Sequence, residues 1–130
     1  QKQNFQIVEL ETTGDSRVNF YLKNKLNSRS EDVNLLKINV EIFSEKKKTV
    51  KEKNINNEIT KYQITITSTV KVKELINEKV FTFTIAKTGD YSVASQYSQT
   101  LTNEKKLIDV LTDDVTNNIL DKIVLKLDDL

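Results

Sequence analysis

The 130-residue chain contains no cysteine, histidine, tryptophan, proline or methionine, and its only glycines are Gly14 and Gly89. Without cysteine it forms no disulfide and no thiolate metal site, and without histidine it lacks the usual general base. A zinc site is close to excluded, because its ligands almost always include one of these two residue types. Two distant glycines cannot form a glycine-rich phosphate loop. Carboxylates, lysine and hydroxyl groups remain, but no pattern arranges them. The residues alone therefore predict a binding or scaffold domain that holds no metal or cofactor, and no pair among the 19 acids stands out for a carboxylate enzyme.

The lack of methionine predicts a processed chain, because translation starts at methionine and this sequence opens at Gln1. A removed secretion signal is the commonest cause. The length is that of one domain, so residues 1–130 are expected to form a single unit. No apolar run is longer than three residues, as at 123–125, whereas a membrane helix needs about 20. The 20 basic and 19 acidic residues nearly cancel, so no overall field favours a nucleic-acid partner.

The first part of the chain predicts a strand followed by a helix. Residues 5–10 are apolar and β-branched, as is typical of a short strand. Asp15 or Ser16 can then cap a helix, because a side-chain oxygen accepts an N–H of the first turn. Residues at helical spacing follow: Val18, Tyr21, Leu22, Lys25 and Leu26. The helix is expected to end near residues 27–29.

In the middle of the chain, apolar and polar residues alternate over the segments 38–42, 62–72 and 80–86. This period of two is typical of strands in a sheet that is packed on one face and solvated on the other. Ser68 is the only polar residue on the apolar side of the second segment. We predict a long turn over 46–57, a short turn at 76–78, and an antiparallel meander that ends at 88–90.

The last part of the chain carries the longest helical pattern. Its apolar positions are Tyr97, Leu101, Leu107, Ile108, Leu111, Val115, Ile119 and Ile123, with Leu120 and Val124 widening the stripe. A helix of this length can cover a whole sheet face. The resulting order β-α-β-β-β-α predicts an α+β two-layer sandwich, a mostly antiparallel four-stranded sheet with two helices packed on one face.

Five lysines and two glutamates fill the segment 45–53, which has a net charge of +3. The lysines are Lys46, Lys47, Lys48, Lys51 and Lys53. A compact group of ammonium charges on a projecting hairpin can bind phosphates. The plainer interpretation is a solvated loop, since lysine commonly blunts an exposed strand. The residues alone favour the plainer interpretation.

Two other patterns have weaker functional interpretations. Residues 104–130 carry seven acids and four lysines, with paired carboxylates at 113–114 and 128–129. Helix neighbours point in different directions and the glycine turn of a calcium loop is absent, so a solvated helix face is favoured. The polar side of the meander carries Thr65, Thr67, Thr69, Thr82 and Thr84. It lacks the aromatics on which an RNA-binding sheet stacks bases, which leaves a partner surface or plain solvent-facing sheet.

Beyond these patterns, the sequence resembles the LptE family, the small outer-membrane lipoproteins of lipopolysaccharide assembly. Segment 60–67 is similar to that family's long central strand, and segment 91–98 to its tyrosine-rich connection into the last helix. Residues 103–123 resemble that helix and residues 16–26 the first helix, so the resemblance covers nearly the whole chain. Two features depart from the family: the lipidated N-terminal cysteine is absent, and the tip of the central hairpin has no glycine turn.

The resemblance implies a domain tethered by a lipid, on a cysteine upstream of Gln1, to the periplasmic side of a Gram-negative outer membrane. It implies a non-enzymatic plug and assembly partner of the LptD β-barrel that binds lipopolysaccharide. The candidate contacts to the lipid's phosphates are Lys46, Lys47, Lys48, Lys51 and Lys53. The alternative is a generic exported adaptor of the same fold class with a different envelope protein as its partner.

Overall fold

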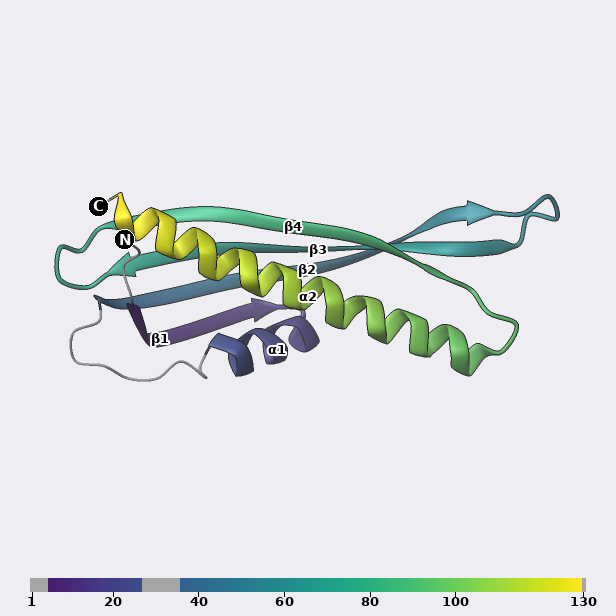
Figure 1. The fold of residues 1–130 in the computed structure, drawn as a ribbon, viewed down its shortest axis with the longest axis horizontal. Helices are drawn as coiled ribbons and strands as arrows, with labels where there is room; N and C mark the ends of the chain where they lie inside the picture. The colour runs from purple at the N-terminus through teal and green to yellow at the C-terminus, as the bar shows by residue number, and fades with distance from the viewer. Residues whose placement is uncertain (1–4, 27–35, 130) are drawn as a thin grey trace.

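The structure, a computed structural model, describes residues 5–26 and 36–129. Its elements are β1 (Phe5–Gly14), α1 (Ser16–Leu26), β2 (Leu36–Lys53), β3 (Ile59–Glu74), β4 (Val80–Ser92) and α2 (Tyr97–Asp128). The predicted element order and the α+β class are confirmed. The long helix α2 runs diagonally along the sheet, and the short helix α1 lies near β1 (Figure 1). The predicted end of the first helix, at 27–29, lies outside the described residues.

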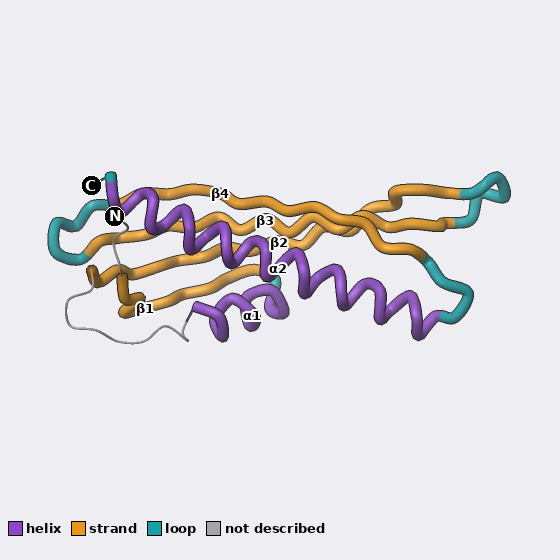
Figure 2. The backbone as a smooth tube through the Cα atoms, viewed as in Figure 1, coloured by secondary structure: helices purple, strands orange, loops and turns teal. Residues whose placement is uncertain are grey.

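The four strands form one sheet in the order β1-β2-β3-β4. The pairs β2–β3 and β3–β4 are antiparallel, as predicted, and β1 is parallel to β2. A parallel pair needs a crossover connection, and α1 lies in the one that joins β1 to β2. Both hairpins are long, so strands and helix α2 together give the molecule an elongated shape (Figure 2).

Alternate residues of the strands face the helices and form the core. The core residues that are at most 2% exposed include Ile38, Val40, Ile42, Ile64, Ile66, Val70, Val72, Val115, Ile119 and Ile123. Ser68, the polar residue in the apolar pattern, lies opposite Ser44 of β2. Their buried hydroxyl groups hydrogen-bond at 2.8 Å, which satisfies both polar groups inside the core.

Several predicted boundaries are wrong, because the strands continue beyond their apolar patterns. The first strand was expected over 5–10, but β1 continues beside β2 to Gly14. Two further boundaries concern the strands that pair with β3. Residues 46–53 were expected in a turn but belong to β2, and the connection to β3 occupies only 54–58. Residues 88–90 were expected to end the meander but pair with residues 63–65, and β4 continues to Ser92. In both places backbone pairing with β3 extends the strand through polar residues. The predicted short turn between β3 and β4 is confirmed.

The junction between β1 and α1 depends on two adjacent residues. Asp15 caps α1, because its Oδ1 accepts the N–H of Val18 at 3.0 Å, which confirms the predicted cap. Gly14 has a φ of 91°, and a Cβ atom there would overlap the backbone carbonyl of Ser44. The chain can therefore leave the sheet at this point only with glycine.

Asp113, one of the paired carboxylates, joins the two helices while its side chain stays partly exposed. It forms an ion pair with Lys25 at 3.1 Å and accepts a hydrogen bond from the Tyr21 hydroxyl at 3.1 Å. The Lys25 ammonium and then the Tyr21 hydroxyl hold the pKa of Asp113 below its ordinary value. A solvated helix face, as predicted for this segment, thus also carries the polar link between α1 and α2.

We expect Gly14→Ala to lower the free energy of unfolding by about 2–4 kcal/mol, because it combines a left-handed backbone with a clash against backbone atoms. The matched control is Gly89→Ala. A Cβ at Gly89 meets the end of the flexible Leu107 side chain at 2.7 Å, so we expect a loss below about 1 kcal/mol. Urea unfolding of both variants measures the difference, and equal losses would contradict this account of the junction.

Candidate functional site

Strand pairing separates the five lysines of the segment 45–53, called here the lysine segment. Lys46 and Lys48 lie opposite Ile66 and Ile64 of β3, so they share the face that the helices cover. Lys47 lies on the other face of the sheet. The register shifts twice between residues 50 and 53, which places the last two lysines in the irregular end of the hairpin. The predicted cluster is therefore not one compact group.

Lys46 and Lys48 each meet a carboxylate from a distant part of the sequence. Lys46 Nζ lies 3.9 Å from Asp15 Oδ2, and Lys48 Nζ lies 3.4 Å from Glu104 Oε1 of α2. The Lys48 ammonium also lies over the ring of Tyr62, 4.4 Å from its centroid, which is the geometry of a cation–π contact. The nearby Tyr91 hydroxyl and the Glu104 carboxylate raise the pKa of Lys48, against the desolvation that lowers it.

A pocket of about 330 Å³, called here the tyrosine pocket, opens where the lysine segment meets the connection from β4 to α2. Its lining residues are Lys48, Ile59, Tyr62, Tyr91, Val93, Ala94, Ser95, Tyr97, Thr100, Leu101 and Glu104. The rings of Tyr62 and Tyr91 stack with centroids 5.6 Å apart, and Tyr97 is 76% exposed. Apolar walls with a few polar groups are typical of ligand sites. Lys48 is the only predicted site residue that lines this pocket.

The Tyr91 hydroxyl is the unusual polar group of the tyrosine pocket. Tyr91 is 5% exposed, and its buried hydroxyl lies near the Lys48 ammonium and the Glu104 carboxylate but forms no hydrogen bond of ordinary geometry among the described residues. Burial raises the pKa of Tyr91, so the phenol stays neutral. Because buried polar groups are nearly always paired, such a hydroxyl marks a place where a bound group can supply the missing partner.

The sequence did not predict the companions of Lys48. Tyr91 was noted only as part of a tyrosine-rich connection, Tyr97 there and as an apolar position of the last helix, and Glu104 only as one of many acids. Their convergence depends on the register that pairs Tyr62 with Tyr91 and Lys48 with Ile64. The one available signal was the alternation that places Tyr62 on the same side as Ile64.

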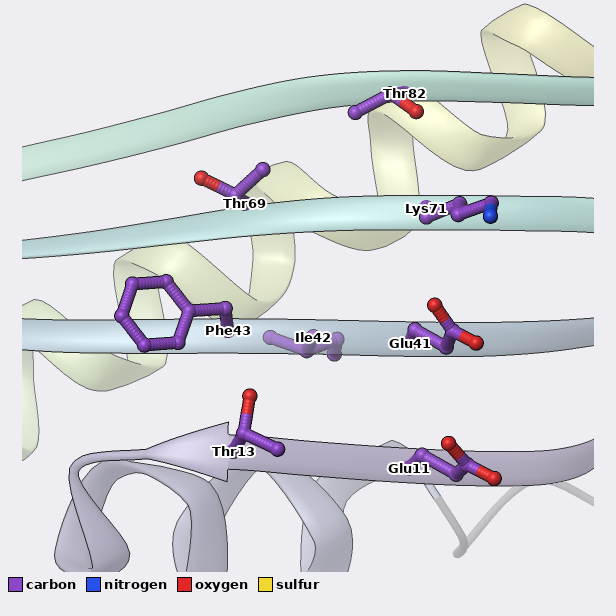
Figure 3. A pocket seen from close by; sticks show the side chains of 8 residues that line it. All are labelled: Glu11, Thr13, Glu41, Ile42, Phe43, Thr69, Lys71 and Thr82. Atoms are coloured by element: carbon purple, nitrogen blue, oxygen red, sulfur yellow. The ribbon is translucent and has the colours of Figure 1, made fainter.

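The opposite face of the sheet confirms the predicted threonine-rich surface. Thr65 hydrogen-bonds Thr88 at 2.9 Å, and Thr69 hydrogen-bonds Thr84 at 3.3 Å. A hollow of about 390 Å³ lies on this face, and its side chains are Glu11, Thr13, Glu41, Ile42, Phe43, Thr69, Lys71 and Thr82. Most of them stand on the open side of the strands, with both helices behind the sheet (Figure 3). The hollow mixes both charges with hydroxyl groups and has one exposed aromatic ring, so it lacks the convergent polar groups of the tyrosine pocket.

Two general features concern the described part of the chain, residues 5–26 and 36–129. No three acidic side chains there lie close enough together to hold a metal ion. Neither of its two helices is long and apolar enough to cross a membrane.

Removing a hydroxyl should have opposite effects at two buried positions of this sheet. We expect Tyr91→Phe to keep or raise the free energy of unfolding, by up to about 1 kcal/mol, because the lost hydroxyl forms no hydrogen bond of ordinary geometry with its neighbours Lys48 and Glu104. We expect Ser68→Ala to lower it by about 1–2 kcal/mol, because the Ser44 hydroxyl then loses its partner. Thermal or urea unfolding measures both, and a clear loss for Tyr91→Phe would show that its hydroxyl is satisfied in the free protein.

The sequence matches no protein-family model and no curated protein. Several solved structures share its fold. Rare lipoprotein B from Shewanella oneidensis has a TM-score of 0.62 at 9% identity, covering 91% of this chain and 95% of that one. A candidate lipoprotein from Caulobacter crescentus CB15 has a TM-score of 0.57 at 9% identity, covering 91% and 89%. Lipoprotein B from Nitrosomonas europaea has a TM-score of 0.55 at 9% identity, covering 94% and 84%. The chain therefore has the fold of these bacterial lipoproteins.

Proposed function

We propose that this chain is the folded domain of an outer-membrane lipoprotein that binds lipopolysaccharide and acts as plug and assembly partner of the LptD barrel, without catalysis. Two findings support the proposal: the fold shared with bacterial lipoproteins and the resemblance of the sequence to the LptE family. The lipid anchor would lie on a cysteine upstream of Gln1, and the domain would sit on the periplasmic side of the membrane.

The observation that carries the lipid-binding proposal is the contact between the lysine segment and the tyrosine pocket through Lys48. Lipopolysaccharide joins phosphates, sugars and acyl chains in one molecule, so its binding site needs cations beside apolar and aromatic walls. Lys47, Lys51 and Lys53 have no ion pair in the described part of the chain, so their ammonium groups are available to phosphates. Tyr62 and the exposed Tyr97 would supply the adjoining aromatic surface.

Lys46 and Lys48 have a different role in this proposal, because their charges already face Asp15 and Glu104. An incoming phosphate would have to compete with these carboxylates. We therefore assign the first contact with the anionic lipid to Lys47, Lys51 and Lys53, and the contact with the pocket to Lys48.

The alternative is an exported adaptor that binds another envelope protein. The threonine-rich surface supports it, because this surface lies on the side of the sheet that the helices leave bare. This adaptor would bind no lipopolysaccharide, and its partner contacts would lie on the threonine-rich surface.

The test compares lipopolysaccharide binding by two triple variants of equal charge change. The arm variant combines Lys47→Glu, Lys51→Glu and Lys53→Glu, and the control combines Lys23→Glu, Lys37→Glu and Lys79→Glu at exposed positions elsewhere. Each lost attraction is about 0.5–1 kcal/mol, so we expect binding at least about tenfold weaker for the arm variant and a much smaller loss for the control. Salt should weaken the wild type more than the arm variant. Equal losses of lipopolysaccharide affinity in both variants would show that the lysine segment is not part of the lipid site.

Co-expression with the LptD barrel separates the two candidate functions. The plug should co-purify with the barrel as a stable one-to-one complex, whereas the adaptor should not. A protein that neither co-purifies with the barrel nor binds lipopolysaccharide would contradict the proposed function and favour the adaptor.

A further inference from the structure

Among the described residues, one edge of β2 has no neighbouring strand over half of its length. The pairing of β1 with β2 ends at Gly14 and Ser44, where β1 turns into α1. Residues 45–53 continue beside β3 alone, and all nine of them are exposed. A strand of ordinary length has about five or six residues, so this free edge is long enough to pair with a whole additional strand.

The register shows which backbone groups face this edge. The carbonyl of Ser44 accepts the N–H of Asp15 at 2.8 Å, so the backbone groups of Ser44 point away from β3. The N–H and C=O of one strand residue point to the same edge, and successive residues alternate. Lys46, Lys48 and Val50 therefore direct their N–H and C=O groups toward the free edge.

The charge of the segment selects the chemistry of a strand that can pair there. A second copy of the same edge would place a net charge of +3 against +3, and like charges on facing strands are destabilising. An acidic strand would instead meet the ammonium groups of Lys47, Lys51 and Lys53, which have no ion pair among the described residues, whereas those of Lys46 and Lys48 already face Asp15 and Glu104. The register shifts after Val50 limit the regular part of the edge to residues 45–50.

We propose that the free edge of β2 from Glu45 to Val50 is a strand-addition site for an acidic, extended segment of a partner protein. The added strand would continue the row that β1 begins, and its backbone would pair with Lys46, Lys48 and Val50. Main-chain hydrogen bonds supply affinity in this mode of recognition, and the side chains of the edge supply specificity. This inference goes beyond lipid binding and does not depend on it.

The experiment uses a capped synthetic peptide of alternating glutamate and valine, of about six residues, the usual length of a strand. Amide hydrogen exchange followed by NMR reports on each position of β2. We expect the amides of Lys46, Lys48 and Val50 to exchange rapidly in the free protein and at least about tenfold more slowly at saturation. A peptide of alternating lysine and valine is the control and should leave them unchanged. Protection on β4 instead, or no protection at saturation, would overturn the proposal.

A matched pair of variants separates strand pairing from simple charge attraction. Lys46→Ala and Lys46→Pro both remove the ammonium group, but only proline removes the N–H that faces the free edge. We expect the proline variant to bind the acidic peptide about tenfold more weakly than the alanine variant, the effect of one lost backbone hydrogen bond. Equal affinities, with circular dichroism showing both variants folded, would mean that the peptide is held by charge alone. If the proline variant does not fold, the exchange result on the wild type decides.

Discussion

The antiparallel pairing of β2 with β3 is the constraint on which the rest of the structure depends. It runs from Ile38 opposite Glu74 to Lys53 opposite Ile59, far beyond the last apolar residue that β2 contributes to the core. This register assigns each lysine to a face of the sheet. It also brings Lys48 beside the stacked rings of Tyr62 and Tyr91, and so creates the tyrosine pocket.

The same constraint explains why one face of the molecule is covered and the other bare. Alternate residues of the strands form one apolar face of the sheet, and α2 is long enough to lie along this face. The other side consists of threonine and mixed charges that need no cover. The lysine segment, the tyrosine pocket and the threonine-rich surface carry the proposed functions.

The sequence predicted the elements and faces that depend on local periodicity, but it did not predict the strand extension and side-chain contacts that depend on the register between strands. Element order, the faces of the strands and the cap at Asp15 follow from local patterns, and all are confirmed. The strand at residues 46–53 does not follow from its local pattern. It is formed by backbone pairing with β3, whose own alternation of apolar and polar residues is clear. Likewise, Lys48 and Glu104 are distant in sequence, and their contact depends on two hairpin registers at once.

The measurement that tests this account most directly is an NMR titration of the Lys48 side chain. The ring of Tyr62 lies under its ammonium group, so the ε-methylene signals should move upfield. The ammonium group should titrate above the ordinary lysine pKa. Signals at unperturbed positions with an ordinary pKa would mean that the lysine segment does not keep its pairing with β3, and the tyrosine pocket would then lack its cation.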